Sequence, residues 1–134
     1  MARVGSRLSK VPPELRYSES HEWVRVEGDV ATIGITDFAQ DQLTDVVYVE
    51  LPKKGAKLET KKPFGVVESV KSVSDLYAPF AGEIVDANDA LQKSPELIND
   101  DPYGRGWMIR VRLKDAAAAQ SLLDAEGYKR VIGE

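Results

Sequence analysis

The feature that most constrains the fold of this chain is a succession of short stretches of strand composition at close spacing. Residues that alternate in polarity, or that are β-branched and aromatic, recur in brief runs separated by turn-forming residues. The ranges predicted as strands are Glu22–Val26, Val30–Ile35, Asp45–Leu51, Pro63–Val70, Ser72–Tyr77, Gly82–Asp86 and Gly106–Leu113. Many short strands with helices only at their edges favour a small barrel or sandwich, so the chain is predicted to be mainly β.

The helices are expected to be short and to begin at capping residues. If Asp37 is the cap of the first helix, Gln40 is placed to complete a capping box. Residues 88–99 are expected to form a loop with one or two helical turns. In chain order, the helices predicted from capping residues are 37–43 after Thr36 or Asp37, 116–123 after Asp115, and 125–132 after Asp124.

Composition excludes several classes of function. The chain has no cysteine, which excludes disulfides, thiolate metal sites and a cysteine nucleophile. His21 is the only histidine, so a histidine-rich metal site is excluded, and no metal is expected. We interpret His21 as a hydrogen-bonding residue of a strand. The net charge of -4 and the absence of a clustered basic face argue against nucleic acid as a partner. No apolar run approaches the roughly 18 residues of a membrane span, so no membrane partner is expected.

The N-terminal range 1–13 differs from the rest of the chain. It carries Arg3, Arg7 and Lys10 without an acidic residue, but it lacks the apolar stretch of about 7–15 residues that a secretory signal needs. We interpret it as a flexible basic tail that ends at Pro12-Pro13. Residues 14–134 are then predicted to form one domain.

The most informative segment is Val66–Pro79, with the sequence VVESVKSVSDLYAP. Lys71 lies at its centre, between two arms of strand composition. The chain must turn there, although neither Asn-Gly nor Asp-Gly is present to form the usual two-residue turn. A lysine at such a tip holds its ammonium in water on a stem of paired strands, where another protein can reach it.

Lys71 has two other interpretations. A lysine at an arbitrary position is most often a solvated surface residue. A Schiff-base lysine needs burial or a neighbouring cation to lower its pKa. The residues around Lys71 are instead the acids Glu68 and Asp75 and several serines, which oppose that role.

Several segments together give the chain a family resemblance. The segment ESVKSVSDLYAP around Lys71 resembles the lipoyl-lysine hairpin of the H protein of the glycine cleavage system. The resemblance runs from about Tyr17 to the C-terminus. The other segments that match in order are SHEWV at 20–24, ATIGITD at 31–37 with Ala39-Gln40, DVVYVELP at 45–52, PFAGE at 79–83, NDDPYG at 99–104 with Gly106-Trp107, and LDA at 123–125 with Tyr128.

The resemblance implies a barrel-sandwich hybrid, as in biotinyl and lipoyl carrier domains, built of two half-barrels with short peripheral and C-terminal helices. It also implies lipoic acid covalently bound to Lys71. The chain would then be a non-catalytic carrier. It would take the aminomethyl group of glycine from glycine decarboxylase to a tetrahydrofolate-dependent aminomethyltransferase, and dihydrolipoyl dehydrogenase would reoxidise the arm. A lipoate ligase or a lipoyl or octanoyl transferase would attach the group.

Two further roles are hypotheses for individual residues, most of them acidic. Glu68 and Asp75 are expected to help the modifying enzyme or the partners recognise the hairpin tip, with a merely solubilising role as the alternative. By the resemblance, Ser20, Glu22 and Asp75 are expected to receive the amine of the loaded arm, through charge-assisted hydrogen bonds to the carboxylates. Ordinary polar residues at a strand edge are the alternative for these three.

Three other classes of carrier have features that can be compared with this sequence. Biotinyl carriers typically place methionine on both sides of their lysine, whereas Val70 and Ser72 stand here. A lipoyl domain of a 2-oxoacid dehydrogenase would be followed by a linker and a catalytic domain, while this chain ends in its own predicted helices. A lipoyl relay, which hands lipoate to other complexes, would have the same sequence features and stays open. A bacterial cytoplasm is expected rather than a mitochondrial matrix, because the N-terminal tail is short.

Overall fold

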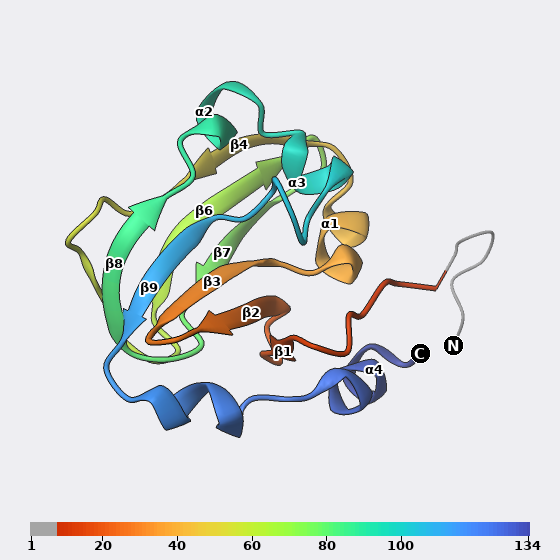
Figure 1. Cartoon of the computed structure of the whole chain (residues 1–134). Helices are drawn as coiled ribbons and strands as arrows, with labels where there is room; N and C mark the ends of the chain where they lie inside the picture. The colour runs from red at the N-terminus through yellow and green to blue at the C-terminus, as the bar shows by residue number, and fades with distance from the viewer. Residues whose placement is uncertain (1–7) are drawn as a thin grey trace.

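Two β-sheets with short helices at their edges make up the protein, shown in Figure 1 as a computed structural model that describes residues 8–134. The larger sheet has six strands in the order β1-β2-β3-β9-β8-β5, and the smaller has three in the order β4-β6-β7. All paired neighbours are antiparallel. The strands are β1 Arg16–Tyr17, β2 Glu22–Glu27, β3 Val30–Ile35, β4 Val46–Glu50, β5 Lys57–Leu58, β6 Pro63–Ser69, β7 Val73–Tyr77, β8 Gly82–Ala87 and β9 Ile109–Leu113.

The main core lies between the two sheets. Ile33 and Ile109 from the larger sheet and Val67 and Leu76 from the smaller one belong to a single buried apolar cluster. The alternation in the sequence therefore has the expected effect, because every second residue of these strands points into the core. The fold is mainly β, as predicted, and it consists of two sheets and not of a closed barrel.

A second, smaller apolar cluster joins the C-terminal helix to the start of the domain. It consists of the buried residues Leu15, Tyr17, Trp23, Ala125 and Tyr128. The rings of Tyr17 and Tyr128 stack with their centroids 4.7 Å apart. These contacts hold α4 Ala125–Ile132 against β1 and β2.

The helices begin where their capping residues predict. The Thr36 side chain accepts a hydrogen bond from the Ala39 N–H and caps α1 Asp37–Leu43, which settles the choice between Thr36 and Asp37. Asp124 caps α4 in the same way. One or two helical turns were predicted within 88–99, and two are present, the second of which extends to Asp100. The stretch after Asp115 is a 3-10 helix that ends at Ser121. These elements are α2 Ala90–Lys93, α3 Leu97–Asp100 and η1 Ala116–Ser121.

The first described residues lie against the body of the domain. Lys10 donates its N–H to Asp37 Oδ2 at 2.8 Å, and its carbonyl accepts from the Tyr103 hydroxyl at 2.5 Å. Ser9 donates to the carboxylate of Glu134. Of the range 1–13 that was predicted as a tail, residues 1–7 lie outside the described residues.

The hairpin of β6 and β7 extends from the core to one end of the molecule. In Figure 1 its tip lies at the upper right, near α1 and α3. The buried residues Val67 and Leu76 anchor its stem in the core, while the tip is exposed. None of the helices within residues 8–134 is both long enough and apolar enough to span a membrane.

Candidate functional site

The turn between β6 and β7 is closed by a serine side chain. Ser69 Oγ accepts hydrogen bonds from the N–H groups of Lys71 at 3.1 Å and Ser72 at 3.0 Å. The Ser69 N–H donates to the Ser72 carbonyl at 2.8 Å, and the Val70 N–H donates to the Asp45 carbonyl at 3.0 Å. A hydroxyl that satisfies two backbone donors replaces the glycine-based turn that the sequence lacks.

Lys71 is at the tip of this turn and exposed. Its Nζ donates to the carbonyl of Gln42 at 3.4 Å, near the C-terminal end of α1. This long contact is the only hydrogen bond of its side chain to the described residues. An amide nitrogen at the same place would still have a hydrogen to donate, so acylation of Lys71 is compatible with its surroundings.

One face of the smaller sheet packs on the core, and the other faces outward. Tyr48, Glu68 and Val73 stand opposite one another across the three strands, and the next row on the same face is Glu50, Val66 and Asp75. Residues directly opposite in a sheet share a face, so these side chains point away from the core. Glu68 and Asp75, predicted to mark the hairpin, therefore lie on the outer face. Asp75 is exposed and its carboxylate makes no hydrogen bond or ion pair with other residues of the range 8–134.

Ser20 and Glu22 form a second candidate site at the start of β2. Glu22 is only 1% exposed. Its Oε1 accepts hydrogen bonds from Ser18 Oγ and Ser20 Oγ, both at 2.5 Å, and its Oε2 accepts from the Tyr77 N–H at 3.2 Å. The carboxylate thus links the larger sheet to β7 of the smaller one. Sequence reasoning missed both partners. Ser18 lies four residues before Glu22 but carries no signal of this contact, and the Tyr77 N–H comes from 55 residues further along the chain.

Burial and hydrogen bonding act on Glu22 in opposite directions. Burial raises the pKa of the Glu22 carboxyl above its ordinary value of 4.5, and the hydrogen bonds from Ser18, Ser20 and the Tyr77 N–H oppose this rise without cancelling it. A carboxylate held in this way is a strong acceptor for a further charged donor.

A cleft adjoins this carboxylate. It has a volume of about 630 Å³ and includes Ser18, Ser20, Tyr77 and Leu123 among its lining residues. Glu22 lies behind the two serines and does not itself line the cleft. Of the three residues predicted to receive an amine, the structure brings Ser20 and Glu22 together, whereas Asp75 lies on β7 two residues before Tyr77.

His21 sits between Ser20 and Glu22 in a left-handed backbone conformation, with φ of 75°. Its Nδ1 lies 2.8 Å from the Tyr128 hydroxyl, which lies 2.7 Å from Thr36 Oγ1. We predicted a hydrogen-bonding strand residue. The hydrogen bond is present, but His21 comes just before β2, because its N–H closes a turn onto the Ser18 carbonyl. Burial lowers the pKa of His21 below its ordinary value of 6.5.

This lowered pKa predicts a pH dependence of stability. The unfolded chain takes up a proton on His21 near pH 6.5, while the folded chain does so only at lower pH, so stability should fall as the pH drops through this window. Glu22, whose pKa is raised, gives the opposite slope above pH 4.5. Urea unfolding of the wild-type chain and of a variant without the imidazole, each at pH 7.0 and 5.5, separates the two contributions. We expect His21→Asn, which tolerates the left-handed backbone, to lose less stability than the wild-type chain between these pH values.

The expected difference stays below the limit of about 1.4 kcal/mol per pH unit, because the ring is only partly buried and solvent screens it. Equal losses in both chains would show that His21 does not contribute to the pH dependence. Asn at 21 also removes the ring contact with Phe38, so the comparison uses the change with pH and not the absolute stability.

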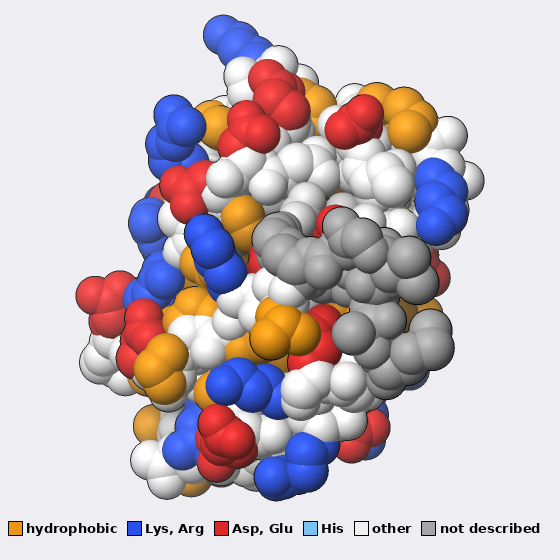
Figure 2. Space-filling model, turned by 90° about the vertical axis from the view of Figure 1, so that its right-hand side faces the viewer, with side chains coloured by type: hydrophobic (Ala, Val, Ile, Leu, Met, Phe, Trp, Pro, Cys, Tyr) orange, Lys and Arg blue, Asp and Glu red, His pale blue; other side chains and the backbone are white. Residues whose placement is uncertain are grey.

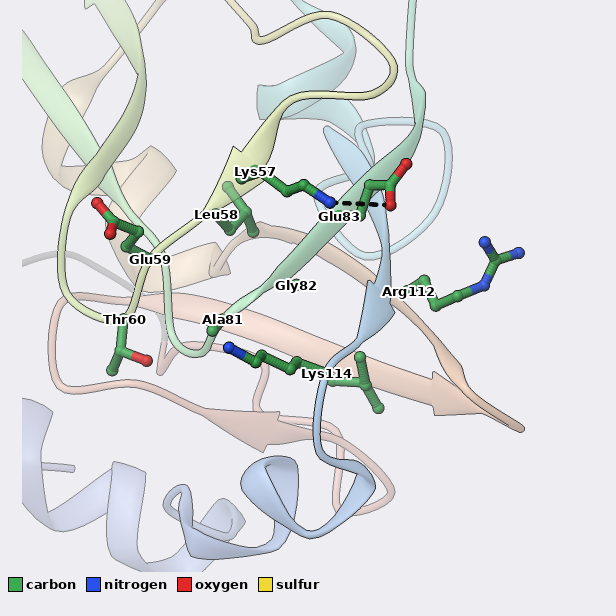
Figure 3. Close-up of a pocket in the computed structure, with 10 residues that line it drawn as sticks. Lys57, Leu58, Glu59, Thr60, Ala81, Gly82, Glu83, Arg112 and Lys114 are labelled. Carbon is green, nitrogen blue, oxygen red and sulfur yellow. Dashed lines mark hydrogen bonds and ion pairs between the residues drawn. The ribbon is translucent and has the colours of Figure 1, made fainter.

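A further hollow of about 580 Å³ lies on the side of β5 and β8, away from the hairpin tip (Figures 1 and 3). Its basic side chains include Lys57, which contacts Glu83 at 3.3 Å, and Arg112, which contacts Asp29 at 3.6 Å. Figure 3 shows the Arg112 guanidinium directed away from the other lining residues. Over residues 8–134, no group of three or more His, Asp and Glu side chains is placed to hold a metal ion.

Known proteins match almost the whole chain. A family model described as Glycine cleavage H-protein matches residues 15–134. The chain belongs to the glycine cleavage H-protein family. It is 54% identical over 121 residues to the Glycine cleavage system H protein of Bacteroides thetaiotaomicron, covering 90% of this chain and 96% of the relative. It is 55% identical over 121 residues to that of Symbiobacterium thermophilum, covering 90% and 94%.

A solved structure supports the same assignment. The crystal structure of a glycine cleavage system H protein from Mycobacterium marinum superposes with a TM-score of 0.85 at 38% identity, over 92% of this chain and all of that one. The barrel-sandwich fold predicted from the sequence is confirmed. Membership in the H-protein family also confirms the predicted function, a lipoyl-bearing carrier of the glycine cleavage system.

Proposed function

We propose that Lys71 is the residue that carries lipoic acid, and that the chain itself is not catalytic. The observation that supports this most strongly is the position of Lys71, which is exposed at the tip of a hairpin whose turn is fixed by Ser69. Among the described residues, modification of Nζ would disturb only one long hydrogen bond, to the Gln42 carbonyl. Attachment forms an amide: the Lys71 ammonium first gives up one proton, the free Nζ attacks an activated lipoyl carbonyl on the modifying enzyme, the activating group leaves with the bonding electrons, and Nζ loses a second proton.

The arm supplies a dithiolane that can be reduced, loaded and reoxidised. For this chain we propose the order glycine decarboxylase, then tetrahydrofolate-dependent aminomethyltransferase, then dihydrolipoyl dehydrogenase, with a lipoate ligase or a lipoyl or octanoyl transferase acting before them. The task of the protein is to hold Lys71 on a stiff stem, which keeps the cargo at a high effective concentration near each partner. The bacterial source of the relatives supports a bacterial cytoplasm as the place of action.

Mass spectrometry tests this proposal. The full chain, co-expressed with a lipoate ligase and supplied with lipoic acid, should gain a single lipoyl adduct that maps to Lys71. A lipoyl domain of known competence serves as the control for the ligase. An unmodified Lys71 beside a modified control would refute the proposal.

We also propose that Ser20, Glu22 and Asp75 receive the amine of the loaded arm. From Val73 to Tyr77, β7 spans about 13 Å, which is similar to the roughly 14 Å of an extended lipoyl-lysine. An arm that follows this strand passes Asp75 and reaches the cleft, where the Ser18 and Ser20 hydroxyls stand in front of Glu22. An ammonium in the cleft could take over the acceptor Oε1 and leave Tyr77 bound to Oε2.

Glu22→Gln should therefore shorten the lifetime of the loaded carrier. The loss of a charge-assisted hydrogen bond predicts a release of amine to water about tenfold faster. Glu27→Gln, on the exposed end of the same strand, should leave the rate unchanged. Equal lifetimes of the Glu22→Gln and wild-type chains, with both folded by circular dichroism, would exclude Glu22 from this role.

A further inference from the structure

The exposed apolar side chains of this protein gather around Lys71. Eight large apolar residues are exposed within residues 8–134, and five of them lie on the smaller sheet or its turn. Four of these five surround the hairpin tip, and we call them the tip patch: Val47 at 53% exposure, Tyr48 at 46%, Val70 at 70% and Val73 at 63%. Apolar side chains that cluster on a surface and not in a core usually mark a contact with another molecule.

The strand pairing places the tip patch on one side of the sheet. Tyr48 and Val73 flank Glu68 in a single row on the outer face, and Val70 lies beside the start of β4 through its hydrogen bond to Asp45. Val47 is the residue at which the register between β4 and β6 shifts. Such an irregularity turns a side chain that would otherwise point inward, which explains why both Val47 and Tyr48 are exposed.

Apart from Lys71 itself, the charged residues of the segments that carry the tip patch are acidic. Lys71 is the only basic residue in β4, β6, β7 and the turn between them. The same segments and the residue before β4 carry the acids Asp45, Glu50, Glu68 and Asp75. Figure 2 shows acidic and apolar side chains adjoining over the upper part of this side of the molecule, with basic side chains above them and at the left edge. A complementary surface would have an apolar centre with lysine or arginine at its rim.

We propose that the tip patch is the docking surface for the enzyme that attaches lipoate to Lys71, with such an apolar, basic-rimmed surface around its active-site cleft. This rests on the proposed modification of Lys71. An unmodified lysine side chain reaches only about 6 Å from its Cα, whereas the finished arm reaches about 14 Å. The modifying enzyme must therefore approach the hairpin itself, while later partners can receive the arm from a greater distance. Of these enzymes, only the modifying enzyme must therefore cover the tip patch around Lys71.

A double variant tests the apolar part of the surface. Tyr48→Thr/Val73→Thr keeps strand-forming residues, and Val26→Thr, on β2 of the other sheet and 41% exposed, is the matched control. The initial rate of lipoylation is measured by mass spectrometry with a lipoate ligase, lipoic acid and ATP over a range of carrier concentrations. We expect kcat/KM to fall about tenfold for the double variant, mainly through KM, because a few central residues, with tyrosine prominent among them, usually dominate an interface. The control should match the wild-type chain.

The outcomes are distinguishable. If the wild-type chain is not lipoylated, the proposed function fails. If it is lipoylated and the double variant is lipoylated equally fast, the docking proposal is overturned. A double variant with an unchanged ligation rate but a short-lived loaded form would overturn it too, and would assign the patch to the docked arm. Thermal unfolding of each variant shows that a loss of rate does not reflect a loss of fold.

The acidic rim has its own test. Glu68→Gln should lower kcat/KM at low salt, and this difference from the wild-type chain should shrink as the salt concentration rises, because screening weakens attraction between exposed charges. Glu27→Gln is the control on the other sheet. A salt dependence that is the same for Glu68→Gln and the wild-type chain would refute the basic rim of the partner.

Discussion

Replacing Lys71 with arginine is expected to reduce carrier activity to background. Arginine keeps the charge and nearly the length of the side chain, but its guanidinium stays protonated and does not form the amide. The fold should not change, because the side chain is exposed and its one hydrogen bond, to the Gln42 carbonyl, is long. The measurement is glycine-dependent NADH formation with the three proposed partner enzymes supplied in excess.

Lys93→Arg is the matched control, since Lys93 is also exposed but lies at the end of α2. It should keep full activity and the lipoyl adduct. Activity of Lys71→Arg above background, or a lipoyl adduct on another lysine of that variant, would contradict the assignment of the arm to Lys71.

Replacing Trp23 with alanine should have the largest effect on stability, a loss of about 3–5 kcal/mol. The side chain is fully buried, and its Nε1 donates to the Pro102 carbonyl at 2.9 Å. Its ring packs against Gly34, where an added Cβ would come within 2.7 Å of Nε1. Truncation therefore leaves a cavity and an unpaired carbonyl together. A domain of this size has only about 5–15 kcal/mol of stability, so the loss should be plain in urea unfolding.

Trp107→Ala is the natural comparison. Both tryptophans stand in segments that alternate in the sequence, which predicts that they are core residues. The structure leaves Trp107 half-buried, with the Arg110 guanidinium 4.0 Å from its ring centroid. Its replacement should cost clearly less than that of Trp23. Equal losses, or a loss below about 1 kcal/mol for Trp23→Ala, would show that burial does not determine the cost here.

The longer strands, which show alternation or a β-branched and aromatic composition, were predictable, and the shortest ones were not. Asp45–Leu51 was predicted and Val46–Glu50 is observed. Two elements, β1 and β5, were missed, because two residues carry no alternation and pair only through tertiary contact. The range after Asp115 was predicted as a helix, and the cap is present, but the helix is of the tighter 3-10 type.

The site shows the same division between local and long-range information. Lys71 could be found from its own neighbours in the sequence, since two strand-forming arms must turn at it. The burial of Glu22 could not, because it depends on Ser18 on one side and on the Tyr77 N–H, which the chain supplies 55 residues later. The exposure of Val47 and Tyr48 was equally hidden, because a run such as VVYV gives no alternation from which to choose the outer face.

The hydrogen bond from the Val70 N–H to the Asp45 carbonyl makes the position of Lys71 depend on the finished sheet. These two groups lie far apart in the sequence and meet only when β4 has paired with β6. A nascent or misfolded chain has the same sequence around Lys71 but no defined hairpin tip for an enzyme to bind. A modifying enzyme that requires this shape would modify only folded chains. The presence of the arm would then show that a carrier has already folded.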